Sequence, residues 1–426
     1  MKLVNNILSI TLVHQARSFS LSMSAAKPKF KSIVVVGGGI QGTSVAYQLH
    51  KASPETSIHI LEAKAPASAA SGKGGGFMAR SWGDGGPTQG LHHLAFDMYE
   101  DLAAELECES YRKLPVLSVS PGYNNKAAKR AAESLGNAMP SWLDGNTGRI
   151  GMMGAGDDTA QVTPKEFVEK MIEKSGVNVV LGECVGVETS DEKKITGVKY
   201  VDRSSKQECI LEADAIVISA GPWSSQCEDW FEGTIDLPME GVKSTSIVWK
   251  PRDGVDTDAT ALFCGEDDRF STHLEVYPRP DNSIYICGIG GSDYITKEEL
   301  KIGAYREECN ARDDRVEAAS NAFQEMSAAY KKDGELDRVQ ACMRPCPPDA
   351  RPYMGKIPGY EGAYLNAGHN CWGIAWAPAC GKAMAELILE GQSSSIDLGP
   401  FSPTRFTTKV SGRGRKKQGE SVGEQW

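Results

Sequence analysis

The feature that most constrains this chain is a cluster of glycines directly after a β-rich run, in "SIVVVGGGIQGTSVAYQL" (residues 32–49). The run "SIVVV" is short, apolar and β-branched, as is typical of a buried parallel strand. Gly37, Gly39 and Gly42 follow with the spacing G-x-G-x-x-G, and "TSVAYQLHK" continues with helical spacing. The unit therefore predicts a strand, a tight turn and a helix whose N-terminus faces a phosphate.

Each glycine has a mechanical task in such a turn. We expect Gly37 to allow the turn itself, Gly39 to let the pyrophosphate approach the backbone, and Gly42 to let the helix pack close to the strand. A second strand, "SIHILEA", carries Glu62 about 20 residues beyond Gly42, where a carboxylate would bind the ribose and repel a 2′-phosphate. No Lys-Ser/Thr pair follows Gly42, which excludes a P-loop and leaves NAD or FAD.

Length and charge narrow the class of protein. A chain of 426 residues predicts more than one lobe, since single cores rarely exceed about 300 residues. Its 46 Lys and Arg stand against 56 Asp and Glu, and this net charge of -10 argues against nucleic acid or an anionic membrane as the partner. We expect no transmembrane segment, because no apolar run of about 18 residues occurs. The 11 cysteines lack zinc spacing, which predicts reduced thiols and no structural metal.

The two ends of the chain differ from the rest. Residues 1–31 are rich in serine, contain no acidic residue and carry Lys2, Arg17, Lys27, Lys29 and Lys31. This composition predicts an organelle-targeting leader, for a plastid or mitochondrion, and the alternative is a disordered extension on a cytoplasmic protein. Residues 407–426 are polar and predict a disordered tail.

Several further stretches carry a family resemblance. Besides "VVVGGGIQGTSVAYQL", they are "LEA" followed by "SAASGKGGG", "QVTPKEFVEKM", "DAIVISAGPWSS", "EVYPRP" and "RPCPPDARPYMGKIPGYEGAYLNAGHNCWGIAWAPACGKAMAELILEG". In this order the chain resembles the D-amino-acid-oxidase-like family of FAD-dependent oxidoreductases over nearly all of residues 32–406. No second strand–GxGxxG–helix unit is present for a nicotinamide nucleotide, which favours FAD as the cofactor.

The resemblance implies a fold and an activity. The fold would be α/β, with a Rossmann-type FAD lobe (32–105, 155–232 and 335–395) interleaved with a β-rich substrate lobe (106–154 and 233–334). The activity would be hydride transfer to flavin from the C–N bond of a small amine or amino acid, with oxygen or another electron acceptor. Two alternatives stay open: a non-catalytic or redox-sensing flavoprotein in assembly or trafficking, and an NAD-dependent dehydrogenase.

The resemblance also implies the cofactor contacts, mostly through backbone. The loop before a helix that has Pro378 near its start and Gly391 just past its end would lie beneath the flavin. The expected FAD contacts are Gly37, Gly39, Ile40, Gln41, Gly42, Glu62, Ala63, Ser71, Gly72, Gly74, Gly75, Gly76, Val185, Ala220, Gly221, Cys342, Gly368, His369, Asn370, Cys371, Trp372 and Gly373.

Arg344, in "CMRPCPPD", is the strongest candidate for binding the substrate. Glycine oxidases and D-amino-acid oxidases carry a carboxylate-binding arginine in a similar context, and a guanidinium fork fixes a carboxylate in two places. The alternative is a structural ion pair, and Arg80, Arg279 and Arg351 are weaker candidates. Tyr277 and Trp372 are expected pocket walls, although aromatic residues at these positions also suit a core.

Two details concern the flavin itself. Cys342 lies in a segment that resembles the one through which sarcosine-oxidase relatives attach FAD covalently, but a small buried thiol is the favoured interpretation. The same relatives place a lysine in a strand over the flavin to promote reaction with oxygen. The comparable piece here, "NSIYICG", has none, so a dehydrogenase with another acceptor remains an alternative to an oxidase.

Overall fold

The structure is a computed structural model that describes residues 29–251 and 257–407. The predicted leader falls outside these ranges up to residue 28, and so does the predicted tail from residue 408. In the described ranges, no helix has both the length and the apolar character needed to cross a bilayer. The same ranges contain no group of His, Cys, Asp or Glu side chains placed to hold a metal.

The first of two large sheets contains the predicted glycine unit. Its eight strands follow the order β10 (Glu208–Glu212), β9 (Ile195–Asp202), β8 (Asn178–Thr189), β2 (Ser57–Glu62), β1 (Ser32–Val36), β11 (Ala215–Ile218), β19 (Ala363–Ala367) and β18 (Tyr353–Lys356). The five strands from β8 to β19 run parallel, and β1 pairs with β2 and β11. All carboxyl ends of these five strands therefore meet at one edge, where ligands bind in open parallel sheets.

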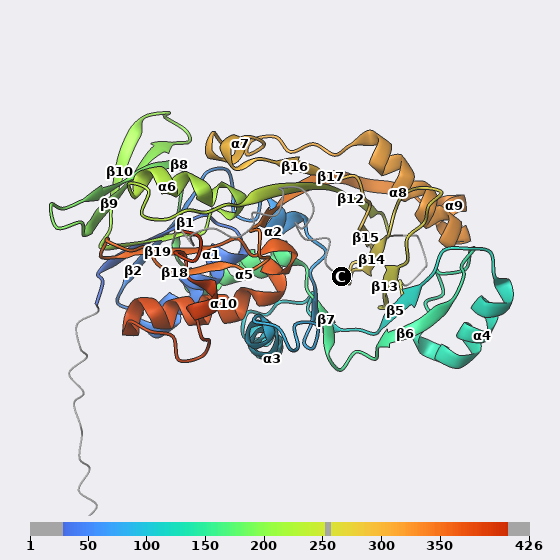
Figure 1. The fold of residues 1–426 in the computed structure, drawn as a ribbon. Helices are drawn as coiled ribbons and strands as arrows, with labels where there is room; N and C mark the ends of the chain where they lie inside the picture. Colours follow the sequence, from blue (N-terminus) through green and yellow to red (C-terminus); the bar gives the residue numbers. More distant parts are fainter. Residues whose placement is uncertain (1–28, 252–256, 408–426) are drawn as a thin grey trace, which may run out of the picture.

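Helices cover one face of this sheet, as Figure 1 shows. They are α1 (Ile40–Ala52), α3 (Gln89–Glu105), α5 (Pro164–Ser175) and α10 (Gly373–Glu390). Alternate side chains of β1 divide between the two faces: Ile33 and Val35 pack with the helices, while Val34 and Val36 pack with residues near α6 (Cys227–Trp230). This burial of both faces explains why the strand is a continuous apolar run.

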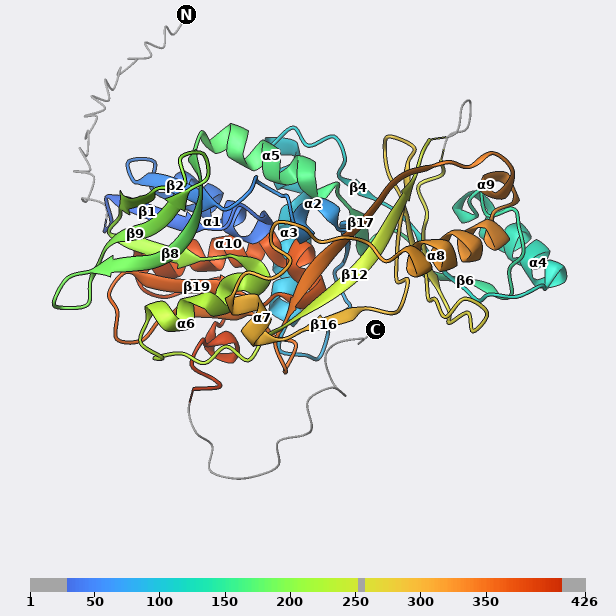
Figure 2. The ribbon, with the colours of Figure 1, turned by 90° about the horizontal axis from the view of Figure 1, so that it is seen from above.

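The second sheet is mainly antiparallel and lies beside the first (Figures 1 and 2). Its order is β16 (Asp293–Ile295), β12 (Glu240–Trp249), β15 (Ile284–Cys287), β14 (Glu275–Pro278), β13 (Ala261–Cys264), β5 (Val116–Val119) and β6 (Ile150–Gly154), and β17 (Leu336–Cys346) pairs with β12. One face packs Val276 and Ile286 against Phe323 of α8 (Asp313–Met326). The other face carries Tyr277 and Tyr285.

Shorter elements connect the two sheets. A small sheet joins β3 (Phe77–Ala79), β7 (Thr159–Gln161) and β4 (Arg112–Lys113). The remaining helices are α2 (Ala70–Lys73), α4 (Asn125–Leu135), α7 (Lys297–Lys301) and α9 (Ala328–Asp333), with the 3₁₀ turns η1 (Gly136–Ala138), η2 (Gly221–Gln226), η3 (Asn370–Trp372) and η4 (Gly399–Phe401). Figure 2 shows β12 and β17 side by side, running from the helices of the first sheet into the second.

The architecture confirms the predicted α/β class, with parallel and antiparallel sheets built from interleaved segments. One strand lies outside the lobe to which the prediction assigned it. The range 335–395 was assigned to the FAD lobe, but β17 within it pairs along β12 and belongs to the second sheet. The predicted helix near the C-terminus is α10, which contains Pro378 and ends at Gly391 in the left-handed conformation.

Candidate active site

The glycine loop has the geometry that the sequence predicts. Gly37 has φ 108°, and a Cβ there would overlap the carbonyl oxygen of Ser219 on the neighbouring strand connection. A Cβ at Gly42 would overlap the carbonyl oxygen of Gly37 and touch Val35, so the helix can start close to its strand only without a side chain. Both tasks are therefore confirmed, since the turn and the close helix packing each exclude a Cβ.

Glu62 ends β2 and closes one end of the loop. Its Oε2 accepts a 2.8 Å hydrogen bond from the Gly38 N–H, and its Oε1 accepts one of 2.8 Å from the Lys64 N–H. Burial raises the pKa of Glu62, while these backbone donors act in the opposite direction. A carboxylate offers about four acceptor sites, so the side chain retains capacity for ribose hydroxyls.

The Gly-rich segment 67–76 links the loop to the second sheet. Ser71 Oγ accepts a 2.8 Å hydrogen bond from the N–H of Ile40, the first residue of α1. At the other end of the segment, a Cβ on Gly75 would lie 2.5 Å from the ring of Tyr277 on β14. The lack of side chains thus lets this backbone lie between a helix N-terminus and an aromatic ring.

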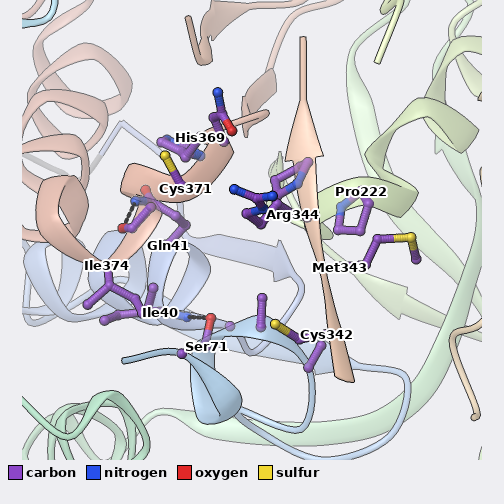
Figure 3. A pocket seen from close by; sticks show the side chains of 18 of the residues that line it. Ile40, Gln41, Ser71, Pro222, Cys342, Met343, Arg344, His369, Cys371 and Ile374 are labelled. Carbon is purple, nitrogen blue, oxygen red and sulfur yellow. Dashed lines mark hydrogen bonds between the residues drawn. The ribbon is translucent and has the colours of Figure 1, made fainter. Parts of the chain in front are cut away.

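The N-termini of α1 and α10 meet at the same place. Gln41 Nε2 donates a 2.6 Å hydrogen bond to the Gly373 carbonyl, and Gln41 Oε1 accepts one of 3.2 Å from Asn366 on β19. Figure 3 shows Gln41 beneath the turn that carries His369 and Cys371. Two partial positive ends of helix dipoles therefore face one region, which favours negative charge there.

A single continuous cavity runs past all of these features and on to the second sheet. Most of the predicted site residues line it, namely Gly37, Gly39, Ile40, Gln41, Glu62, Ala63, Ser71, Gly74, Gly75, Gly76, Ala220, Gly221, Tyr277, Cys342, Arg344, His369, Asn370, Cys371, Trp372 and Gly373. The structure thus brings together residues from the start, the middle and the end of the chain. Their roles as cofactor or substrate contacts remain predictions.

Four predicted cofactor contacts do not line the cavity. Val185 is 41% exposed on β8, and the preceding residues Gly182 to Cys184 face the cavity instead. Gly42 serves helix packing. A Cβ on Gly72 would overlap the Ala67 carbonyl oxygen, and one on Gly368, with φ 74°, would press on Pro347 and Tyr353. Each of these three glycines allows a close packing contact next to the cavity wall without lining the cavity itself.

Aromatic side chains form the wall at the second-sheet end. Phe77 stacks on Tyr277 with ring centroids 5.5 Å apart, and Trp82 lies 5.0 Å from Phe263. The ring of Trp372 meets Trp82 edge-on at 6.2 Å. Tyr277 and Trp372 therefore contribute to a pocket wall, as the sequence predicts, and Trp372 also packs on the core beneath α10.

Arg344 projects from β17 into the cavity toward the turn with His369 and Cys371 (Figure 3). Within the described residues, its guanidinium donates a long hydrogen bond of 3.4 Å to Ser244 Oγ, and its buried Nε has no partner. The guanidinium is permanently charged and has five N–H donors. A buried cation with unused donors points to an anionic group of a ligand.

The weaker arginine candidates lie elsewhere. Arg80 pairs with Asp97 at 2.8 Å near the surface, and Arg351 does not line the cavity. Arg279 is buried, but it donates to the Gly74 carbonyl at 3.3 Å and lies over the ring of Tyr285. These contacts describe structural roles for Arg80 and Arg279.

Burial sets the protonation of two groups in the cavity wall. Burial lowers the pKa of His369 to about 3, so its imidazole is neutral, and its Nε2 has no hydrogen-bond partner in the described part of the chain. Burial raises the pKa of Cys342 to about 11, so this thiol stays protonated at neutral pH. A thiolate, not a thiol, is the nucleophile, and the geometry therefore favours the interpretation of Cys342 as a small buried thiol.

Sequence reasoning missed Glu275. This carboxylate lies on β14 two residues before Tyr277 and lines the same cavity. Its signal was present in "HLEVYP", where the alternation of a strand puts Glu275 on the face of Tyr277 and opposite Val276. The segment was used for the resemblance, but the direction of its faces follows only from the pairing of β14 with β13 and β15.

These features fit FAD. The glycine loop excludes side chains where a pyrophosphate would lie, and two helix N-termini favour its charge. Polar atoms along the wall, such as His369 Nε2 and Asn366 Oδ1, lack partners among the described residues. The cavity extends from Glu62 at the first sheet to Arg344 at the second. It thus suits a dinucleotide with a small molecule beyond it.

Comparison with known proteins gives a consistent result. Residues 32–387 match the family model DAO, described as FAD dependent oxidoreductase. A Schizosaccharomyces pombe protein named as an oxidoreductase is 27% identical over 395 residues, and the match covers 88% of this chain and 98% of the yeast protein. The peroxisomal sarcosine oxidase of Mus musculus is 24% identical, and the match covers 90% of this chain and 98% of the mouse protein. The L-amino acid deaminase structure from Proteus vulgaris has a TM-score of 0.70 at 18% identity, and the match covers 89% of this chain and 98% of that one. This similarity shows the fold alone.

Proposed function

This chain belongs to the DAO family of FAD-dependent oxidoreductases, and from that premise we propose that it oxidises the C–N bond of a small amino acid or amine. The observation that carries the proposal is the buried guanidinium of Arg344, whose Nε has no partner among the described residues, in the cavity that begins at the glycine loop. A carboxylate-bearing amine is the small ligand that this end of the cavity would bind.

The first sheet would hold FAD through its backbone. Gly37 and Gly39 would approach the pyrophosphate, Glu62 would accept hydrogen bonds from the ribose, and the turn from His369 to Gly373 would contact the isoalloxazine ring. Bound FAD supplies a two-electron acceptor for the hydride of a C–H bond next to nitrogen. The N-terminus of α10 would stabilise negative charge on a ligand at this turn.

The second sheet would orient the substrate. Arg344 can bind a carboxylate in two places, which fixes the direction of the α-carbon, and orientation of this kind is a large part of catalysis. Phe77, Tyr277 and Phe263 would exclude water from the reacting bond. His369 would stay neutral, so Arg344 would be the cation that meets the substrate in this region.

The test is the visible absorption spectrum of the purified full-length protein in the absence of air. Glycine, sarcosine, proline, a set of D-amino acids and a set of small amines without a carboxylate would each be added, with buffer as the control. Bleaching of the oxidised flavin bands by one compound would support the proposal and identify the substrate class. Bleaching by amines that lack a carboxylate, and by no amino acid, would contradict the role of Arg344.

The same spectrum separates the alternative functions. A flavin that stays oxidised with every compound would favour the non-catalytic or redox-sensing flavoprotein. The NAD-dependent dehydrogenase is set aside, because the family is FAD-dependent. Readmitting air after bleaching would test oxygen as acceptor: slow reoxidation is expected, since the strand "NSIYICG" carries no lysine, and fast reoxidation would show an oxidase.

We also propose that residues 1–31 direct the protein to a plastid or mitochondrion, on the strength of their basic, acid-free composition. Fusing residues 1–35 to a fluorescent protein would test this, with a fusion that begins at residue 32 as the control. Diffuse cytosolic fluorescence of the first fusion would contradict the proposal.

A further inference from the structure

Two opposite charges face the same end of the cavity without pairing with each other. Arg344 on β17 and Glu275 on β14 both line it. Within the described part of the chain, no ion pair joins them, yet each is close enough to shift the pKa of the other. Both charges therefore act on the same end of the cavity, and neither neutralises the other by direct contact.

The contacts of Glu275 leave one of its oxygens unused. Oε2 accepts hydrogen bonds from the Tyr277 hydroxyl and, at 3.5 Å, from the Cys287 thiol. Among the described residues, none donates to Oε1, and this atom is not among the buried side-chain atoms sealed off without a partner. Tyr277 and Cys287 thus fix the carboxylate, while Oε1 stays open to the cavity.

The surroundings of Glu275 contain little that would neutralise it. Burial raises the pKa of Glu275, and Tyr277, Cys287 and the charge of Arg344 oppose this effect. The titratable groups whose pKa is coupled to that of Glu275 come from its own strand and from β13, β15, β17 and η3, and they are Tyr277, Cys264, Cys287, Arg344 and Cys371. His273, two residues before Glu275, also lines the cavity. Arg344 is the single cation of this set. A largely buried carboxylate is unfavourable in its charged form unless a cation reaches it.

A ligand that carries both charges would satisfy both side chains. On the premise of the proposed function, we propose that Glu275 binds the ammonium group of the substrate through Oε1 while Arg344 binds its carboxylate. The site then selects small zwitterionic amino acids over simple carboxylates and over amines without a carboxylate. Tyr277 is a positioning residue in this arrangement, because its hydroxyl holds Oε2.

The test measures binding without turnover. The ligand 2-aminoisobutyrate is zwitterionic but has no α-hydrogen and is not oxidised in this way, and isobutyrate is the same molecule without the amine. Isothermal titration calorimetry on the FAD-loaded full-length protein would give both affinities. We expect the wild type to prefer 2-aminoisobutyrate by about 10- to 100-fold, the usual effect of one charged hydrogen bond.

Three variants separate the contributions. Glu275→Gln keeps the shape and removes the charge, so it should lose most of the preference, while its affinity for isobutyrate should not fall because the repulsion of an anion is removed. Tyr277→Phe should reduce the preference less. Arg344→Ala should weaken both ligands. Flavin content and the thermal midpoint verify that each variant is folded.

The outcomes distinguish this inference from the proposed function. A Glu275→Gln protein that retains the wild-type preference overturns the ammonium site and leaves the role of Arg344 intact. Equal wild-type affinities for the two ligands overturn it as well, and this comparison needs no variant should Glu275→Gln fail to fold. If Arg344→Ala leaves both affinities unchanged, or the wild type binds neither ligand, the proposed function fails together with the inference.

Discussion

The two ends of the cavity are built by different means. At the first sheet the wall is backbone, because a Cβ at Gly37 or Gly42 would overlap a carbonyl oxygen. At the second sheet the wall is side chains, with Glu275, Tyr277 and Arg344 projecting from antiparallel strands. A backbone site recognises a group that many proteins share, whereas a side-chain site selects one ligand among many. The comparison predicts that damage to the first end removes the cofactor and that damage to the second changes the substrate.

The largest effect is expected from Gly37→Ala. The new Cβ would meet the Ser219 carbonyl, and a positive φ of 108° is strained for alanine. Strain of about 1–3 kcal/mol adds to an overpacking penalty of similar size, so FAD affinity should fall by 100-fold or more. The measurement is the ratio of flavin to protein absorbance after dialysis.

Gly151→Ala on β6 is the matched control, because a Cβ there meets nothing within 4 Å. It should retain flavin like the wild type. Full flavin retention by Gly37→Ala would show that the loop does not form the nucleotide end.

The second largest effect is expected from Arg344→Ala. Removing a buried charged partner of a carboxylate typically weakens binding by about 2–5 kcal/mol, so KM for the amino acid should rise by about 100-fold. Flavin content should not change, since Arg344 lies at the second-sheet end. Steady-state kinetics and the flavin spectrum check the two statements separately.

Arg80→Ala is the control for a lost arginine. Arg80 is near the surface, and its pair with Asp97 is worth at most about 1 kcal/mol. The KM of the Arg80→Ala variant should match that of the wild type. Loss of flavin from Arg344→Ala would contradict the division of labour between the two ends.

This division explains what the sequence could reveal. The proposed nucleotide end depends on local spacing within one strand, one turn and one helix, so the steric tasks of Gly37 and Gly42 could be predicted from the residues alone. The family resemblance predicts the turn around His369 as a flavin contact, and this role remains a prediction. In both places a missing Cβ is a signal that a sequence displays directly.

The substrate end could not be derived in the same way. Glu275 and Arg344 line the same cavity because β14 and β17 belong to one sheet, joined through β12 and β15. No spacing in the sequence predicts that pairing of strands. The assignment of β17 to the FAD lobe failed for this reason. Val185 does not line the cavity, although its neighbour Cys184 does, and the pairing of β8 with β9 is irregular between Cys184 and Gly186.

A third, smaller effect concerns acid stability at the flavin turn. Burial lowers the pKa of His369 from 6.5 to about 3, so the unfolded chain binds a proton in this window that the folded chain does not. Stability should therefore fall as pH decreases from 6.5 toward 3, by about 2 kcal/mol at pH 5 for this group. His369→Asn removes the titration.

Urea unfolding of wild type and His369→Asn at pH 7 and pH 5 would measure the contribution of His369 to the pH dependence of stability. The difference in unfolding free energy between the two proteins should shift by about 2 kcal/mol in favour of the variant at the lower pH. All other titrating groups are common to both proteins and cancel. An unchanged difference would show that the imidazole is accessible to protons, and hence that the turn is open to water.

The smallest effect is expected from Cys342→Ala, although Cys342 lies beside Arg344 and lines the same cavity. Burial raises the pKa of its thiol to about 11, so the nucleophilic thiolate is scarce at neutral pH. Acid precipitation should release all flavin into the supernatant from wild type and variant alike, and FAD affinity should agree within about fivefold, since loss of one small buried group costs about 1 kcal/mol. Flavin retained in the wild-type precipitate and lost from that of the variant would reveal a covalent bond. In that case a side chain of the second sheet would hold the cofactor, and the backbone of the first sheet would no longer be sufficient to explain its binding.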